Sequence, residues 1–136
     1  MRITSEWQEG FKSVINNGRN HRVTVDLPYL QHGKDEGPSS LELAVMGYAG
    51  CVTTVYKMMA EKLKVEVFAM RCVINTEYNG KTIGKAEILL ELISDHPAEL
   101  LKKAYKLTQN NCPVGILFKN SGVDITYNIS IQRKTQ

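Results

Sequence analysis

One long apolar segment constrains the fold of this chain more than any other feature. A mostly apolar run extends from Leu41 to Leu63, and its part between Leu43 and Tyr56 has no charged side chain. Hydrophobic residues fall on every side of a helix built from this segment, and such a helix is normally buried. The uncharged part is shorter than the roughly 20 residues that a bilayer-spanning helix needs. We therefore expect this helix at the centre of the molecule or of a dimer.

The start of this helix also has a signature. Ser39 or Ser40 is suited to the N-cap position, and Glu42 would lie in the first turn, where a carboxylate interacts favourably with the helix dipole. The segment just before it, from Pro28 to Pro38, contains glycines and several charges and is expected to be a loop.

Alternating or β-branched segments on both sides of the helix predict strands. Asn79-Gly80 is a strong hairpin signal between two of them. A second, amphipathic helix is expected after Pro97 and ends near Asn110-Asn111, and Cys112-Pro113 opens a short third helical piece. The predicted strands cover residues 2–8, 11–15, 22–27, 64–78, 82–93 and 123–131.

The resulting order, β-β-β-α-β-β-α-β, predicts an α+β protein built on antiparallel strands. At 136 residues the chain is expected to be a single domain, residues 1–136, or one half of an intertwined dimer. The net charge of +3 is modest and its lysines and arginines are scattered among acids, so no nucleic-acid partner is expected. Neither a signal peptide nor a membrane partner is expected.

Three cysteines give the main chemical information. Their odd number and the lack of a close pair argue against a structural disulfide framework and favour a reducing, cytoplasmic location. Cys51 lies in the middle of the apolar helix, where a free cysteine is often a small buried hydrophobe. Cys112 precedes a helix, where backbone amides can stabilise a thiolate. Cys72 lies within a predicted strand and is expected to be structural.

The spacing of the potential ligand residues indicates neither a metal site nor a cofactor site. The three histidines and the cysteines lack the close spacing that zinc sites use, and there is no glycine-rich phosphate loop or paired-carboxylate signature. We therefore expect no metal and no cofactor.

Two motifs together resemble the OsmC/Ohr family, the osmotically inducible protein C and organic hydroperoxide resistance proteins. The first is the segment from Gly37 to Cys51, Gly-Pro-Ser-Ser-Leu-Glu-Leu-Ala-Val-Met-Gly-Tyr-Ala-Gly-Cys, which opens the central helix. The second is Asn111-Cys112-Pro113-Val114, after the second long helix. The length and the order of elements also match, so the resemblance extends over nearly the whole chain.

The resemblance implies an OsmC-like fold, with antiparallel sheets wrapped around two central helices in an intertwined homodimer. It also implies a cysteine-based peroxidase that reduces organic hydroperoxides to alcohols without a metal or prosthetic group. By this analogy Cys51 is the peroxidatic cysteine and Cys112 the resolving one. The thiolate of Cys51 would become a sulfenic acid, which condenses with Cys112 to a disulfide that an external dithiol reduces.

A buried thiol needs a nearby cation to ionise, because burial among apolar groups raises a thiol's pKa. In hydroperoxide-reducing relatives an arginine from the N-terminal strands has this role, held by a glutamate at the start of the helix. The first hairpin turn, Glu9-Gly10, has no arginine, so the candidates are Arg19 and Arg22. Glu42 is the nearest match to the glutamate. The predicted catalytic set is therefore Cys51, Cys112, Glu42 and Arg19.

Two other interpretations stay open at this stage. The chain could be a non-catalytic, redox-sensing or small-ligand-binding member that kept the cysteines and lost the activating arginine. It could also be a structural dimeric module with inert thiols. If it is a peroxidase, apolar side chains of the central helix would form a pocket for a hydrocarbon tail, namely Met46, Tyr48, Met58 and Met59.

Overall fold

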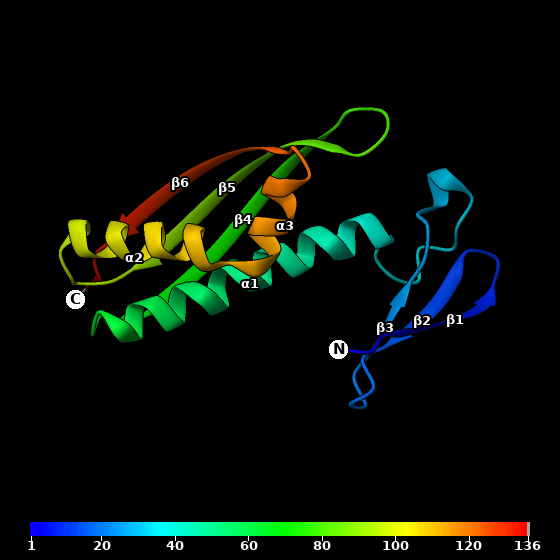
Figure 1. Ribbon diagram of the computed structural model, residues 1–136, viewed down its shortest axis with the longest axis horizontal. Helices are drawn as coiled ribbons and strands as arrows, with labels where there is room; N and C mark the ends of the chain where they lie inside the picture. The colour runs from blue at the N-terminus through cyan, green and yellow to red at the C-terminus, as the bar shows by residue number, and fades with distance from the viewer. Residues whose placement is uncertain (136) are drawn as a thin grey trace. The chain divides into compact units, whose positions relative to one another are not determined.

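The computed structural model describes residues 1–135 (Figure 1). These residues form two compact units, one comprising Met1–Met46 and the other beginning at Gly47. The long helix α1, Ser40–Lys62, begins in the first unit and continues into the second. Within the part of the chain that the structure describes, no helix has the length and apolar character needed to cross a membrane.

The first unit contains a three-stranded antiparallel sheet in the order β1-β2-β3. Its strands are β1 (Thr4–Glu9), β2 (Lys12–Asn16) and β3 (Arg22–Val25), close to the predicted segments. The predicted hairpin turn at Glu9-Gly10 is present, and a second turn that contains Gly18 joins β2 to β3. Each favours a glycine, because Gly10 has φ +51° and Gly18 has φ +77°, conformations that a residue without Cβ adopts most easily.

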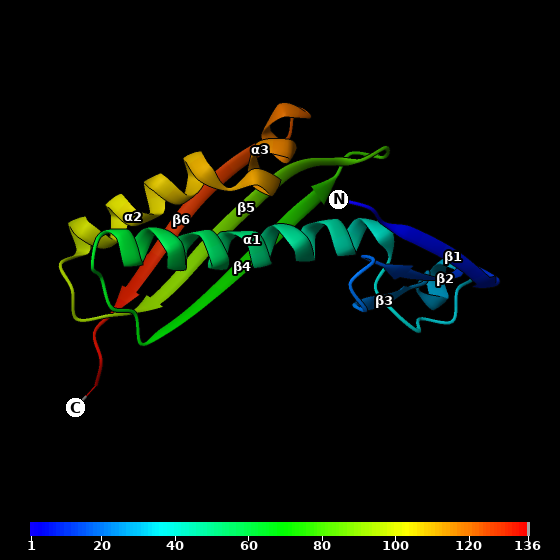
Figure 2. The ribbon, with the colours of Figure 1, turned by 60° about the horizontal axis from the view of Figure 1, so that its bottom comes forward.

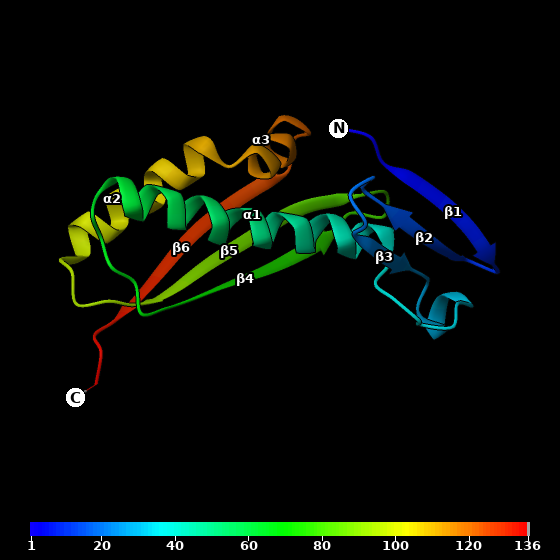
Figure 3. The ribbon, with the colours of Figure 1, turned by 90° about the horizontal axis from the view of Figure 1, so that it is seen from below.

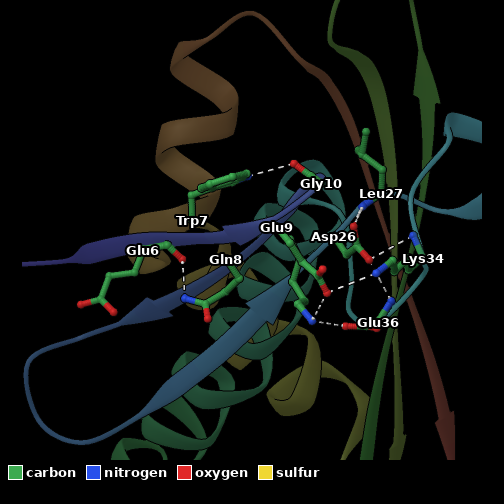
Figure 4. A network of polar contacts seen from close by, with 10 residues as sticks. Glu6, Trp7, Gln8, Glu9, Gly10, Asp26, Leu27, Lys34 and Glu36 are labelled. Atoms are coloured by element: carbon green, nitrogen blue, oxygen red, sulfur yellow. Dashed lines mark hydrogen bonds and ion pairs between the residues drawn. The ribbon is translucent and has the colours of Figure 1, made fainter.

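A buried carboxylate organises the loop that follows β3 (Figure 4). Asp26 is 3% exposed and accepts hydrogen bonds from the backbone N–H groups of Leu27 (2.8 Å), Lys34 (3.2 Å) and Glu36 (3.2 Å). Burial raises the pKa of this carboxyl, but the three donors outweigh it and leave the pKa below its usual value. The loop, which includes the short 3-10 helix η1 (Tyr29–Gln31), is therefore fixed by one charged side chain.

Helix α1 begins with a reciprocal pair of cap hydrogen bonds. Ser39 Oγ accepts from the Glu42 N–H at 3.2 Å, and Glu42 Oε2 accepts from the Ser39 N–H at 2.7 Å. This arrangement is a capping box, which satisfies two backbone donors at the exposed helix start. The predicted start at Ser39 or Ser40 is thereby confirmed.

The end of α1 differs from the prediction that a strand begins at residue 64. Lys64 has φ +54°, its N–H donates to Glu61 O at 3.0 Å, and the Val65 N–H donates to Ala60 O at 2.8 Å. These two bonds are those of a Schellman motif, in which one left-handed residue ends a helix. Strand β4 therefore begins only at Ala69 and extends to Tyr78. A lysine in place of the usual glycine hid this signal in the sequence.

The second unit is built on a sheet with the order β4-β5-β6. Strands β4 and β5 (Ile83–Ile93) form the predicted antiparallel hairpin. Helices α2 (Ala98–Asn111) and α3 (Pro113–Asn120) then connect β5 to β6 (Asp124–Gln132). Figures 2 and 3 show α1 and α2 on the same face of this sheet.

The expectation of purely antiparallel sheets is wrong for one pairing. Strand β6 runs parallel to β5, with Ile88 opposite Tyr127 and Leu90 opposite Ile129. A parallel neighbour requires a crossover connection of a dozen or more residues, and α2 with α3 supplies it. The α+β class and the predicted order of elements are confirmed, with α3 as the expected short helical piece.

The core of the second unit lies between this sheet and the two long helices. Ile88, Leu90 and Leu92 alternate along β5 and are at most 2% exposed, as expected for a strand with one buried face. Tyr56 from α1 and Leu101 from α2 are fully buried against the same core, and the Tyr56 hydroxyl donates to the Leu101 carbonyl at 3.3 Å.

Helix α1 is not enclosed on all sides within this chain. Tyr48, Val52, Val55 and Met59 belong to its buried face, whereas Met58 is 52% exposed. The second unit of this chain buries one face of the helix, because its sheet covers a single side. The expectation that a dimer buries the other face stays a prediction.

Candidate active site

The structure brings two of the predicted site residues into contact. Cys51 lies in the middle of α1, and Cys112 lies between α2 and α3. Their Sγ atoms are 2.9 Å apart although the residues are separated by 61 positions, and both thiols are free. Only about 1 Å of approach separates this contact from the S–S bond length of ~2.05 Å. The arrangement is therefore ready for a disulfide.

The local sequence explains why Cys112 stands at a break between helices. Cys112 has φ −78° and ψ +107°, an extended conformation that ends α2 and caps α3. Pro113 follows at the first helical position, where its missing N–H costs nothing, and a proline disfavours helical geometry in the residue before it. The Gly115 N–H donates to Cys112 Sγ at 3.4 Å. The sulfur thus serves as the N-cap acceptor of α3.

The two sulfurs differ in exposure, and burial acts on the pKa of Cys112. Cys112 is 2% exposed, whereas Cys51 is only partly buried. Burial raises the pKa of the Cys112 thiol, the contact with Cys51 adds to this rise, and the N–H groups of Gly115 and Val114 oppose it. Cys112 is accordingly held as a thiol, and its S–H donates to Cys51 Sγ.

Tyr48 also lies close to the two thiols. The sequence did not predict the contacts that this side chain makes. It is 1% exposed, its hydroxyl is 3.1 Å from that of Tyr127, and its ring centroid lies 4.9 Å from that of Phe118 on α3. Burial and the Tyr127 hydroxyl raise the pKa of Tyr48 well above its usual value, so it stays neutral. The only indication in the sequence was that Tyr48 precedes Cys51 by about one turn of the predicted helix.

Two of the four side chains predicted to line a hydrocarbon pocket on α1 lie in the core instead. Tyr48 and Met59 belong to the packed core, where Met59 is 5% exposed, while Met58 points away from that core. Residues at positions 48 and 59 share one helix face and position 58 lies on another, because a helix turns about 100° per residue. The core therefore accounts for Tyr48 and Met59, whereas a pocket lined by the exposed Met46 and Met58 stays a prediction.

Cys72 has the structural position that the sequence predicted. It lies on β4, packs against the core and pairs with Leu90 across the hairpin. Burial raises the pKa of this thiol to about 11, which keeps it protonated and unreactive near neutral pH.

Arg19, Arg22 and Glu42 belong to the first unit. Arg19 lies in the turn between β2 and β3, where its backbone N–H donates to Asn17 Oδ1 at 2.9 Å, and its side chain is exposed. Arg22 begins β3. The Glu42 carboxylate takes part in the capping box described above. The roles of Arg19 or Arg22 as the activating cation, and of Glu42 as its holder, stay predictions.

Metal ligands do not gather in this structure. Within residues 1–135 there is no cluster of three or more histidine, cysteine, aspartate or glutamate side chains suited to a metal ion. The chemistry that the arrangement can perform is that of two thiols, namely oxidation of one sulfur and closure to a disulfide.

Fold and site together define a small α+β protein with a paired-thiol site. A family profile described as OsmC-like protein matches residues 33–128, which is more than half of the 136-residue chain. The chain therefore belongs to the OsmC-like family, and the resemblance drawn from the two cysteine motifs is confirmed. A search of curated protein sequences finds no match.

Solved structures share the fold over almost the entire chain. An OsmC-like protein from Mycoplasma pneumoniae is 15% identical, with a TM-score of 0.84, and the match covers 96% of this chain and 95% of that one. An organic hydroperoxide resistance protein from Elizabethkingia anophelis is 14% identical, with a TM-score of 0.70 and coverage of 96% and 94%. An organic hydroperoxide resistance protein, OsmC, from Legionella pneumophila is 14% identical, with a TM-score of 0.69 and coverage of 96% and 97%.

Proposed function

We propose that this protein is a thiol peroxidase that reduces organic hydroperoxides to alcohols. The observation that carries the proposal is the 2.9 Å contact between Cys51 Sγ and Cys112 Sγ. Membership of the OsmC-like family supports it, as do structural neighbours that are named organic hydroperoxide resistance proteins.

Exposure and the contact between the sulfurs assign a role to each of them. Cys51 is the partly exposed one and accepts a hydrogen bond, so it attacks the peroxide. Its thiolate attacks the terminal oxygen of the hydroperoxide, an S–O bond forms and the O–O bond breaks. The alkoxide leaves and takes up one proton to become the alcohol, and Cys51 becomes a sulfenic acid. Cys112, buried and protonated, cannot meet a substrate first and acts as the resolving thiol.

Resolution and recycling complete the cycle. The sulfur of Cys112 attacks the sulfenic sulfur of Cys51, a disulfide forms, and the hydroxyl leaves as water with the thiol proton. An external dithiol then reduces the disulfide by exchange. Because Cys112 is 2% exposed, this reductant reaches the Cys51 sulfur and releases Cys112 as the leaving thiol.

The proposal is tested by mixing the reduced protein with a slight excess of an organic hydroperoxide and mapping the products by mass spectrometry. A Cys51–Cys112 disulfide that forms faster than with hydrogen peroxide, together with turnover when a dithiol is supplied, is the expected result. A disulfide without turnover would instead favour a redox sensor. Free thiols after treatment would leave only a binding or structural role.

We also propose that the protein is a homodimer. The sheet of the first unit presents apolar side chains on one face, with Trp7 71% and Val23 40% exposed, and Met58 on α1 and Leu117 on α3 are 52% and 68% exposed in the second unit. Exposed apolar surface of this kind marks an interaction site in a soluble protein. A second copy of the chain is the occupant that the family resemblance implies.

Sedimentation velocity over a range of protein concentrations measures this association. We expect a species of twice the mass of the 15.3 kDa chain at micromolar concentration. Replacing Met58 by lysine places a charge in the buried interface and should shift the equilibrium toward monomer. A monomeric wild-type protein at every concentration would contradict the proposal.

A further inference from the structure

The segments that carry Cys51 and Cys112 approach each other at a second point, in addition to the contact between the two sulfurs. Tyr48 precedes Cys51 by three residues on α1, and Gly115 follows Cys112 by three residues on α3. Residues three apart on a helix lie on neighbouring positions of the same face. The contact between Tyr48 and Gly115 therefore lies beside the thiol pair and joins the same two helices.

The fit at this contact depends on glycine. A Cβ built on Gly115 would lie 3.0 Å from both Cε2 and Oη of Tyr48, closer than carbon atoms normally pack. The glycine does not have a positive φ, so backbone conformation does not require it here. The crowding at this position therefore comes from the tyrosine ring and not from the backbone conformation.

Tyr48 cannot easily move aside. Its ring is 1% exposed, its hydroxyl is held by the Tyr127 hydroxyl at 3.1 Å, and Phe118 packs on its face from the next turn of α3. A buried ring fixed on two sides transmits a clash to the backbone opposite it, because protein interiors are close-packed. An added methyl group at Gly115 would therefore force the start of α3 and the Tyr48 ring apart by a few tenths of an ångström.

Gly115 also contacts the resolving sulfur directly, since its N–H donates to Cys112 Sγ at 3.4 Å. We propose that Gly115, seated against Tyr48, is a positioning residue that holds Cys112 Sγ against Cys51 Sγ for disulfide closure. This inference rests on the proposed roles of the two cysteines. It assigns Gly115 and Tyr48 to the second step, resolution, and not to the attack of Cys51 on the peroxide.

The test compares Gly115→Ala with the wild-type protein by rapid quenching, using mass spectrometry to follow sulfenic acid at Cys51 and the disulfide separately. Misplacement of a reacting group by about 1 Å can cost up to ~10²-fold in rate. Because the shift expected here is smaller, we expect disulfide closure to slow several-fold, by a factor below that limit. The sulfenic acid then accumulates, while the rate at which Cys51 is first oxidised stays unchanged. An unchanged closure rate, or equal slowing of both steps, would overturn the assignment.

A second variant separates positioning from a general loss of structure. Tyr48→Phe removes the hydroxyl that lies against Gly115 and its tie to Tyr127, so the ring of the double variant Gly115→Ala, Tyr48→Phe can shift away from the added methyl group. We expect closure in the double variant to be faster than in Gly115→Ala alone. Lys119→Ala, an exposed change on the same helix, is the matched control and should leave both steps unchanged. Additive slowing in the double variant would count against positioning through Tyr48.

The same variants are then treated with glutathione disulfide, which tests positioning without any peroxide. Cys51 attacks the reagent and releases one glutathione, and Cys112 then displaces the second glutathione to close the protein disulfide. Gly115→Ala should accumulate the mixed disulfide at Cys51. If peroxide proves unreactive but this difference appears, the peroxidase proposal fails and the positioning role stands; if closure is unchanged in both assays, the positioning role fails.

Discussion

Replacing Cys51 by serine is expected to lower hydroperoxide turnover by about 100-fold or more, because the thiolate is the attacking group and a serine hydroxyl is not oxidised by peroxide. Cys51 is only partly buried and serine differs from it by one atom, so the folded structure should be retained. Turnover is followed as alcohol formation in the presence of an excess dithiol, and circular dichroism reports the fold.

Cys72→Ser is the matched control for the loss of a thiol. Cys72 lies on β4, and burial raises its pKa to about 11, so it contributes no nucleophile. Turnover in Cys72→Ser should stay near the wild-type value. If Cys51→Ser kept its activity and Cys72→Ser lost it, the site would have been assigned to the wrong sulfur.

Replacing Cys112 by serine is expected to separate the two halves of the reaction. The first equivalent of hydroperoxide is still consumed, because Cys51 is intact, but no intramolecular disulfide can form. The sulfenic acid then persists and is oxidised further to sulfinic acid when peroxide is in excess. Intact-protein mass spectrometry should therefore show one and then two added oxygen atoms, and sustained turnover should fall by about tenfold or more as the enzyme is inactivated.

Serine suits this position structurally. Cys112 Sγ is the N-cap acceptor of α3, and serine is a preferred N-cap residue, so the N–H of Gly115 keeps a partner. A loss of activity in Cys112→Ser therefore reports chemistry and not a lost helix. A variant that cycled at the wild-type rate and gained no oxygen would show that Cys112 takes no part in resolution.

The elements with signals inside a few neighbouring residues could be predicted well. The start of α1 follows from Ser39 and Glu42, which bond to each other three positions apart. The turns at Gly10 and Gly18 follow from the freedom of glycine at positive φ. Where a local signal was atypical the prediction was wrong, as at Lys64, a lysine that ends α1 in the left-handed conformation.

The direction of β6 could not be predicted from its own residues. Its alternation indicates a strand with one buried face, and this pattern is the same whether the neighbouring strand is parallel or antiparallel. The choice depends on how α2 and α3 carry the chain back across the sheet before β6 pairs with β5. That path is a property of packing between elements.

The candidate active site, like the fold, was predictable from the sequence only in part. The sequence by itself determined the two candidate reactive cysteines, because Cys51 and Cys112 each lie in a recognisable motif on an expected element. It also determined the family. Only the tertiary structure decided that Cys51 and Cys112 touch, that Cys112 is the buried partner, and that Tyr48 rests against Gly115 beside them. Local motifs are set by bonds between near neighbours in the chain, whereas these contacts join α1 to the start of α3 and exist only once the core between the helices and the sheet has packed.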